Sequence, residues 1–428
     1  MGDQSATAGA AVTPRGTSVL DPHAEVVLAH LAGQHGRGLK VPVIAALADL
    51  PTATAERHMH HLQRLGLAHH QGLGRYCADD QGLERLGIKP IAVDGAARSR
   101  VTRWYAASVF AAAQVLGVAA IPDNETLAGD PGRAPHRPVD PGEALDWFTT
   151  ARPELFEVLG AAVEDDDVHH GWRLAVVILN VLCLLGTDWQ DAVELGCRAA
   201  QRAGHGAGLG MVLEYQGKLL LTNGNLGAAQ CAQEEALQVR AEAGDRLGII
   251  RSTNALGLIQ LRGQDYRLAL EYFDRTLGLA RDGGDDEFVI FGQMNRGAAL
   301  VRLGHSELAI VELEQACQAL RAEGRLSYLS NALQDLAFAQ RVAGQHARGL
   351  ENAIEAVEAA EASRIPMFMP GALVELAAHR TGAGERRLAL AHLQEAHAIY
   401  EQLGDQPNTT GVSRLIEWCS RAAGGGHR

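Results

Sequence analysis

LGMVLEYQGKLLLTNGNLGAAQCAQEEALQVRAEAGDRLG occupies residues 209–248, and IIRSTNALGLIQLRGQDYRLALEYFDRTLGLARDGGDDEF follows it at 249–288. Across residues 209–405, small residues recur every forty positions. Three series carry the pattern: Gly217, Gly257, Gly297, Ala337 and Ala377; Ala229, Ala269, Ala309, Gly349 and Ala389; Ala236, Thr276, Ala316, Ala356 and Ala396. Two further series mark turns: Gly224, Gln264, Gly304, Gly344 and Gly384; Gly244, Gly284, Gly324 and Gly404. Several series sharing one period indicate an internal repeat.

Each repeat is predicted to be a helical hairpin. Small residues let two antiparallel helices approach closely, and glycine ends helices because it tolerates the left-handed conformation. One hairpin leaves an apolar face uncovered, so neighbouring hairpins must stack into a superhelix with a concave face. The spacing of Gly217, Ala229 and Ala236 resembles the tetratricopeptide (TPR) motif, with aromatic residues at the expected positions Tyr266 and Phe273. This resemblance covers the chain from about residue 170 onward.

Composition limits the possible partners. The 428 residues are 47% hydrophobic and only 5% aromatic, which suits close-packed helices. The formal net charge is −13, and because residues 21–90 balance seven Lys/Arg against seven Asp/Glu, the excess lies in 91–428. The repeats should therefore repel nucleic acid and anionic membranes. The apolar stretch 174–186 is expected to be a buried helix, too short to span a bilayer.

The cysteines and the N-terminus favour the cytoplasm. The six cysteines are scattered without a CxxC motif, so we expect buried small hydrophobes in a reducing compartment. The N-terminus lacks a basic region followed by an apolar run, so no signal peptide is expected.

The N-terminal part predicts three helices and a hairpin. Helices are expected at 22–34, 41–50 and 52–65, with a threonine cap and Glu56 in the first turn of the third. Met59, Leu62 and Leu65 of that helix should face the core. Residues 67–77 indicate a two-stranded hairpin with a glycine-containing turn. This order is the plan of a winged helix-turn-helix.

The order of modules resembles the C-terminal half of SARP-type regulators of the STAND NTPase class, which control antibiotic pathways in actinobacteria. The sequence GRY at 74–76 is followed by RWYA at 103–106, a proline-rich loop at 122–141 and EALDWF at 143–148. In that family an NB-ARC nucleotide-binding module precedes the winged helix, and TPRs follow it. This sequence contains no GxxxxGK[ST] motif, so we expect the nucleotide switch to be absent.

The expected fold is thus all-α: a TPR-like α-α superhelix, or solenoid, with a small N-terminal winged helix-turn-helix. The expected divisions are a disordered segment 1–20, the winged helix 21–95, connecting helices with a proline-rich loop 96–168, an array of about six hairpins 169–405, and a capping helix with a tail 406–428. Trp418 is expected to cover the apolar face of the last hairpin.

The third helix is one candidate site. If the winged helix binds DNA, outward and turn residues should contact the duplex. The candidates are Thr52, Thr54, Arg57, His60, His61, Arg64 and Arg75. The balanced charge of this part argues against strong DNA binding, and in STAND proteins the winged helix often serves as a packing module.

Histidines cluster in the same region. His58 and His61 lie three apart, and His60, His69 and His70 are close in sequence. Because no acidic or cysteine partner stands at zinc-site spacing, a solvated histidine patch is favoured and no metal is expected.

The concave groove is the second candidate site. On the TPR plan, residues of the first helix of each hairpin face inward. The candidates are Glu214, Lys218, Arg251, Asn254, Arg262, Arg302, Asn331, Gln334, Phe338 and Arg341. This polar set of mixed charge suits a peptide, a protein or a small effector, although any solvated repeat face can have such a composition.

Three functions remain open from the sequence. The first is a regulator whose groove binds a ligand and whose winged helix acts at double-stranded DNA. The second is a DNA-independent scaffold or adaptor, and the third is an auxiliary protein or atypical enzyme of a natural-product pathway. Because no Ser-His-Asp, HExxH, paired-carboxylate or Rossmann signature is found, no enzymatic activity and no cofactor are expected. The oligomeric state stays open, with a homodimer possible.

Overall fold

The computed structural model describes residues 20–34, 37–118, 135–185 and 188–424. They form two compact units. The first ends at Trp104 but also includes Pro135, and the second contains the remaining described residues from Tyr105 onward. The segment 1–19 and most of the proline-rich loop lie outside the described residues, and so does the disorder expected for that segment. The two units are described separately.

The first unit contains short helices and a small antiparallel sheet. In chain order its elements are α1 (Pro22–Ala32), β1 (Leu39–Lys40), α2 (Val41–Leu47), α3 (Thr52–Arg64), β2 (Ala68–Gly72), β3 (Arg75–Ala78), α4 (Asp80–Leu86) and the start of α5 (Gly95–Val115). The strand order is β1-β3-β2. Leu28, Ile44, Met59 and Leu62 lie in one core that joins α1, α2 and α3.

The first unit differs from the sequence-based predictions in several places. Leu65 does not face the core: it lies just after α3, and 44% of it is exposed. No threonine caps α3, because its N-cap is Pro51 and Thr52 is already its first residue. The strand β1 and the helix α4 were not anticipated. β1 is too short to show an alternating pattern, whereas Asp79 does cap α4 by accepting from the Gly82 amide at 2.7 Å.

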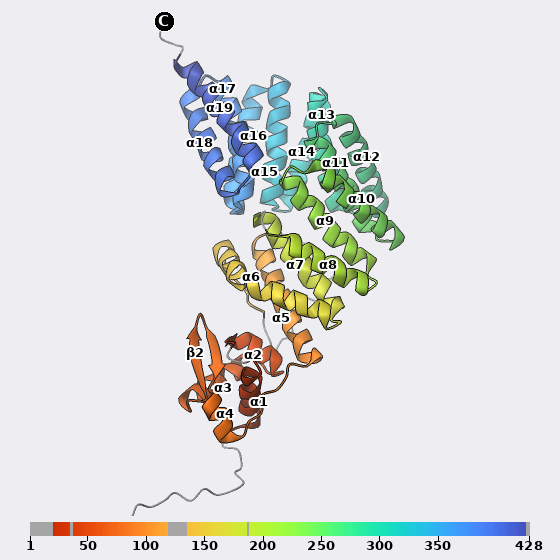
Figure 1. The fold of residues 1–428 in the computed structure, drawn as a ribbon. Helices are drawn as coiled ribbons and strands as arrows, with labels where there is room; N and C mark the ends of the chain where they lie inside the picture. The colour runs from red at the N-terminus through yellow and green to blue at the C-terminus, as the bar shows by residue number, and fades with distance from the viewer. Residues whose placement is uncertain (1–19, 35–36, 119–134, 186–187, 425–428) are drawn as a thin grey trace, which may run out of the picture. The chain divides into compact units, whose positions relative to one another are not determined.

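The second unit is a series of antiparallel helical hairpins (Figure 1). Its helices are the rest of α5, α6 (Pro141–Glu164), α7 (Val168–Leu185), α8 (Gln190–Arg202), α9 (Gly206–Thr222), α10 (Leu226–Glu242), α11 (Arg246–Arg262), α12 (Tyr266–Gly283), α13 (Asp286–Arg302), α14 (Ser306–Ala322), α15 (Leu326–Val342), α16 (His346–Ser363), the 3-10 turn η2 (Pro366–Phe368), α17 (Met369–Gly382), α18 (Arg386–Gln402) and α19 (Gln406–Gly424). From α6 onward each helix packs on the next, which confirms the all-α, TPR-like superhelix.

The small-residue series mark close approaches within hairpins. A Cβ added at Gly217 would stand 2.5 Å from Nε2 of Gln233, and one added at Gly297 would stand 2.6 Å from Cγ of Leu313. In these two hairpins the second helix contributes a larger side chain opposite the glycine. The small residue of the first helix is therefore a packing requirement.

The turn series marks left-handed backbone. Gly224, Gly304 and Gly344 have φ of 76°, 86° and 78°, and Gln264 adopts a φ of 66° at the corresponding position. Arg364, where the last series lacks glycine, has a φ of 58°. The helix stop is therefore conserved in geometry from repeat to repeat even where the residue type changes.

The hairpins from α9 to α18 stack with their first helices inward. Each first helix contacts the first helix of the next hairpin, from α9 with α11 to α15 with α17, whereas successive second helices make no contact of that extent. The stack therefore bends toward its first helices. We call the side formed by α9, α11, α13, α15 and α17 the inner face.

The helix α7 is longer than the sequence analysis predicted. It covers Val168–Leu185, so the apolar helix is longer than the stretch 174–186 and has enough length and apolar composition to cross a membrane. However, 67% of it is buried in the structure, against α6, α8 and α9. Its apolar surface is thus used in the core, as expected for a buried helix.

Two further expectations were wrong. Trp418 on α19 does not cover the last hairpin, because 59% of it is exposed; Val412 and Cys419 are the buried α19 residues of the hydrophobic core there. Cys231 is exposed on α10, and Cys183 and Cys197 are only half-buried, so not every cysteine is a core residue. All six cysteines are free thiols.

Candidate binding face of the repeat array

The helix α15 shows how the inner face is built. Tyr328, Asn331, Gln334, Phe338 and Arg341 follow one another at spacings of three or four residues, so they share one side of the helix. All five are half-buried. The inner face is therefore partly open to solvent, and its side chains also contact neighbouring helices.

Glu214 on α9 is the centre of a buried ionic cluster. Its Oε1 lies 2.6 Å from Nζ of Lys218 and accepts from Nη2 of Arg251 at 2.8 Å. Its Oε2 accepts from Nε of Arg251 and from Nη2 of Arg240, both at 2.8 Å. Only 2% of Glu214 is exposed. The carboxylate of Glu214 is fully occupied by three cations, so it is not free to contact a ligand directly.

These cations determine the charge state of the cluster. Burial alone would raise the pKa of Glu214, but Arg251, Lys218 and Arg240 outweigh it and hold that pKa well below its usual range. Glu214 in turn raises the pKa of Lys218 against the effect of burial. The cluster is therefore ionised at neutral pH and ties α9 to α10 and α11.

Polar contacts link later first helices in the same way. Asn295 on α13 donates from Nδ2 to Oδ1 of Asn254 on α11 at 2.9 Å. Arg302 on α13 lies 3.4 Å from Oδ1 of Asp335 on α15. Adjacent first helices are thus joined side chain to side chain across the inner face.

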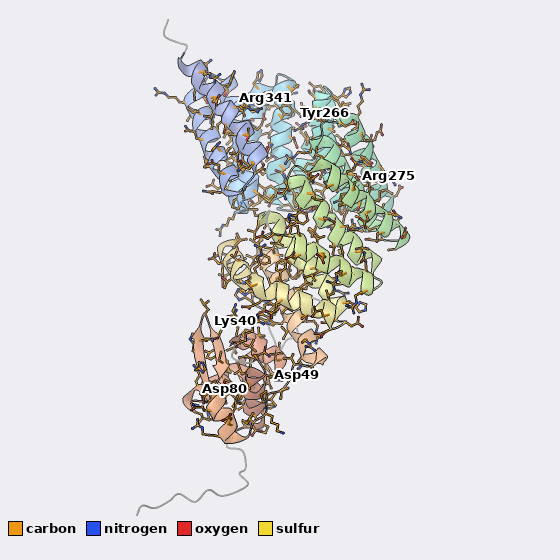
Figure 2. The ribbon with its side chains drawn as sticks, in the orientation of Figure 1. Lys40, Asp49, Asp80, Tyr266, Arg275 and Arg341 are labelled. Atoms are coloured by element: carbon orange, nitrogen blue, oxygen red, sulfur yellow. The ribbon has the colours of Figure 1, made fainter. Side chains whose placement is uncertain are left out.

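Phe338 lies between two arginines at the C-terminal end of α15. The guanidinium carbons of Arg302 and Arg341 stand 5.4 Å and 5.1 Å from its ring centroid. Arg341 (labelled in Figure 2) also pairs with Glu375 on α17, Nε to Oε1 at 2.9 Å and Nη2 to Oε2 at 3.2 Å. Because Glu375 fixes Arg341, the stacked ring is held in place by both neighbouring helices.

Burial changes the acid–base properties of this end. Burial raises the pKa of Asp335 and of Glu375, although Arg302 and Arg341 respectively oppose the change. Burial also lowers the pKa of His379, whose Nε2 lies 3.2 Å from the Ala337 carbonyl oxygen. The contacts of Glu375 with Arg341 and of His379 with the Ala337 carbonyl link α15 to α17.

A row of aromatic side chains runs from the N-terminal part of α13 across that of α15 to η2. The ring centroids of Phe288 and Phe291 are 5.8 Å apart, those of Phe291 and Tyr328 4.7 Å, and those of Tyr328 and Phe368 6.4 Å. The Arg325 guanidinium lies 4.9 Å from the Phe291 ring and 4.8 Å from the Tyr328 ring. All four rings are half-buried.

Sequence reasoning missed this row although its signal is periodic. Phe288, Tyr328 and Phe368 stand forty positions apart, in register with the small-residue series. The row is confined to α13, α15 and η2, because Gly208 and Gly248 occupy the same register in the preceding repeats. Only the later repeats therefore carry aromatic residues at this register.

The other predicted inner-face residues differ in exposure. The Lys218 side chain is 44% exposed, and Arg262 at the end of α11 is exposed. Gln334 extends toward α17, because a Cβ added at Gly371 would stand 2.5 Å from its Oε1. Asn331 is half-buried. It stands between Tyr328 of the aromatic row and Phe338 in the sequence of α15.

The DNA candidates of the first unit fall into two groups. Arg57, His60 and Arg64 are exposed on α3 at helical spacing, and His61 is half-buried. Arg57 donates from Nη2 to the Thr54 hydroxyl at 3.1 Å.

The remaining two candidates are less free. The Thr52 hydroxyl is buried, with no hydrogen-bond partner among the described residues. Arg75 is half-buried on β3 and donates from Nη1 to the Gly38 carbonyl at 3.0 Å, so its guanidinium is engaged within the sheet.

Comparisons with known proteins support the fold alone. No family model matches the chain, and no curated protein matches it. A solved STAND protein with a tetratricopeptide repeat sensor, from Pyrococcus horikoshii, aligns with 92% of this chain and 53% of its own, at 12% identity and a TM-score of 0.53. NprR in complex with its cognate peptide NprX aligns with 64% of this chain and 83% of its own, at 11% identity and a TM-score of 0.48. The chain spans about half the length of that STAND protein.

Proposed function

We propose that the protein is a cytoplasmic regulator whose repeat array binds a peptide or an extended protein segment on its inner face. The observation that carries this proposal is the row of half-buried rings from Phe288 to Phe368, with Arg325 stacked on two of them. Rings and arginines supply contact area to apolar side chains and hydrogen bonds to peptide carbonyls, and both are enriched where proteins recognise partners.

The arrangement of α15 adds a second contact zone. Phe338, held by Arg302 and Arg341, lies on the same side of α15 as Tyr328. Ten residues of helix separate Tyr328 from Phe338, which corresponds to about 15 Å. An extended segment of about five residues covers that distance, so a short peptide could contact both zones at once.

A library of short synthetic peptides, screened by fluorescence anisotropy against the full chain, tests this proposal. Asn331→Trp places a bulky ring between the two zones and should weaken each selected peptide at least tenfold. Leu308→Trp is the matched control, because Leu308 is exposed on the second helix α14, away from the inner face. Binding that survives Asn331→Trp, or a library without a binder, would contradict the proposal.

A second part of the proposal concerns the first unit. Its three helices followed by a β-hairpin have the order of a winged helix, and α3 exposes Arg57, His60 and Arg64 on one side. Leu73 at the hairpin tip is 82% exposed. We propose that this unit binds double-stranded DNA, so that ligand binding by the array regulates transcription, as the SARP-type resemblance implies. In the P. horikoshii protein the repeats are a sensor, and we propose the same role here.

The competing function is a DNA-independent scaffold. In that case the array binds a protein partner through the same inner face, and the first unit only packs. The balanced charge of residues 21–90 favours this alternative, because DNA binding depends on phosphate neutralisation. A DNA titration separates the two functions without affecting the peptide assay.

A further inference from the structure

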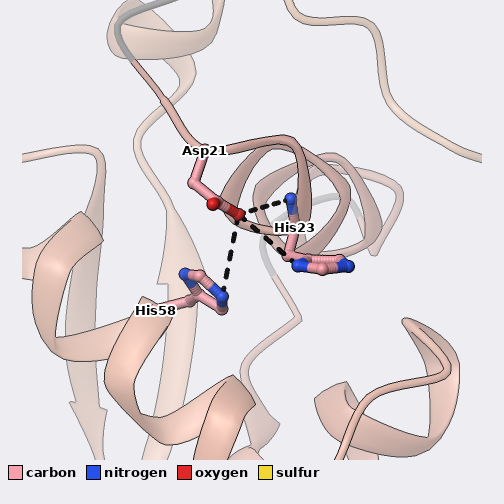
Figure 3. Close-up of side chains that lie close together, drawn as sticks. All are labelled: Asp21, His23 and His58. Carbon is pink, nitrogen blue, oxygen red and sulfur yellow. Dashed lines mark hydrogen bonds and ion pairs between the residues drawn. The ribbon is translucent and has the colours of Figure 1, made fainter.

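Three potential metal ligands meet at the start of α1. Asp21 is the N-cap of α1, His23 lies in its first turn, and His58 reaches them from α3 (Figure 3). Nδ1 of His23 lies 3.6 Å from Oδ1 of Asp21, and Nε2 of His58 lies 3.9 Å from the same oxygen. All three ligand atoms lie within 4.8 Å of one another.

We propose that Asp21, His23 and His58 bind a transition-metal ion of the zinc(II) class. Two imidazoles and one carboxylate form a donor set that such ions accept, and three protein ligands leave a coordination position for water. The histidine spacing within α3 does not show this site, because the ligands come from two helices that are distant in sequence. Folding supplies the acidic partner that the sequence around His58 lacks.

The distances to Asp21 require only a small adjustment. Zinc bonds of about 2.0–2.2 Å in a tetrahedral arrangement place ligand atoms about 3.3–3.6 Å apart. The distances from Oδ1 of Asp21 to the two imidazole nitrogens, 3.6 Å and 3.9 Å, match this range to within tenths of an ångström, and the two nitrogens lie within 4.8 Å of each other. The His23 side chain is 62% exposed, so it can rotate inward, whereas the His58 side chain is only 18% exposed and is already held against α1.

Capping and metal binding by Asp21 are compatible. Its Oδ1 accepts from the His23 amide at 2.8 Å. An ionised carboxylate offers about four lone-pair sites, so one amide leaves room for a cation. The positive end of the α1 dipole opposes a cation here, and this places the site among moderate rather than very tight ones. A bound ion would join the start of α1 to α3, the helix that carries the DNA candidates.

The test uses the full chain after dialysis against a chelator. Titration with Zn²⁺ by calorimetry, and with Co²⁺ by visible absorption, should show one equivalent bound. Asp21→Asn keeps the helix cap, since asparagine caps as well as aspartate, but removes the charged ligand. Asp21→Asn and His58→Gln should each weaken binding at least tenfold, while His69→Gln, on the exposed part of β2, should bind as the unchanged protein does.

Thermal unfolding provides an independent readout. Zn²⁺ should raise the melting temperature of the unchanged chain and of His69→Gln, but not that of His58→Gln. Circular dichroism of each variant without metal shows whether it is folded. No binding of either metal, or binding that Asp21→Asn and His58→Gln leave unchanged, would overturn the proposal, and the three groups would then form ion pairs only.

Discussion

Gly257 on α11 lies directly against the ring of Phe273 on α12: a Cβ added at Gly257 would stand 2.5 Å from Cε1 of that ring. Phe273 is completely buried, so its ring has no free space to move into. The pair explains why a helix tolerates a glycine in its middle. The helix loses propensity at Gly257, and the hairpin gains a contact with a large aromatic side chain.

Gly257→Ala should therefore destabilise the protein. Alanine improves helix propensity by about 1 kcal/mol, but the clash with Phe273 should cost more, about 1–3 kcal/mol. Gly278→Ala on α12 is the matched control, because no atom lies within 4 Å of a Cβ added there. Urea unfolding should show a lower midpoint for Gly257→Ala and an unchanged or higher one for Gly278→Ala. Equal effects would mean that the two hairpin helices are not in this register.

The repeat was predictable from the sequence because its cause is local. A small residue facing a large one, and a turn that needs left-handed backbone, leave a periodic trace such as Gly297 and Gly304. For the inner face, the sequence predicted which residues share one side of the helix but not which contacts they make. Helical spacing identified Phe338 and Arg341, but not that Glu375 fixes the arginine or that Arg302 covers the ring.

Contacts between distant segments left no such trace. Asp21 and His58 meet only because α1 packs on α3, and no spacing rule relates them. The exposure of Trp418 and Leu65 was misjudged for a related reason. Leu65 lies one residue beyond the end of α3, and Trp418 lies beside the buried Cys419 on α19, so helical spacing alone did not assign their sides correctly.

The buried carboxylate of Glu214 gives a pH-dependent prediction. Breaking a buried ion pair typically costs about 3–5 kcal/mol, so Glu214→Gln should strongly destabilise the array at neutral pH. Because the folded-state pKa of Glu214 is depressed, its stabilising contribution is present above its unfolded value of about 4.5 and is lost as pH falls through the lower folded value. The difference in unfolding free energy between the unchanged chain and Glu214→Gln should thus shrink toward low pH.

Urea unfolding at about pH 7 and about pH 3.5 measures this difference on both sides of the unfolded value. Glu307→Gln serves as a control, because Glu307 is exposed on α14 and should have little effect at either pH. A Glu214→Gln penalty that stays constant with pH would show that Glu214 is not a paired carboxylate in the folded state.

The last helix should stabilise the array through its buried residues and not through Trp418. Val412 and Cys419 of α19 lie in a core with Leu393 of α18. Val412→Ala should cost about 1–2 kcal/mol, and deleting 406–428 should cost more, because it uncovers the whole end of that core. Trp418→Ala should change stability by no more than about 0.5 kcal/mol, since the ring is mostly exposed. Thermal unfolding followed by circular dichroism compares the three; a larger loss for Trp418→Ala than for Val412→Ala would contradict the assigned face of α19.

The final prediction separates the regulator from the scaffold. If the first unit binds DNA, Arg57 and Arg64 must supply most of the favourable field, because they are the exposed arginines of α3 in a region with balanced charge. Affinity should be modest, and each lost phosphate contact should reduce the slope of log K against log salt by about one. The Arg57→Ala/Arg64→Ala double variant should abolish binding while leaving the stability of the array unchanged.

Anisotropy titrations against duplexes from the promoters flanking the gene, at two salt concentrations, measure both affinity and slope. Arg85→Ala is the matched control, because Arg85 is an exposed arginine of the same unit on α4, near Asp79 rather than on α3. It should reduce affinity far less than the double variant does, since a general loss of positive charge acts weakly through screened solvent. Arg75→Ala should also have a small effect, because its guanidinium is engaged by the Gly38 carbonyl. If no duplex binds at low salt, or if Arg85→Ala and the double variant weaken binding equally, α3 is not a DNA-reading helix and the scaffold function is the better one.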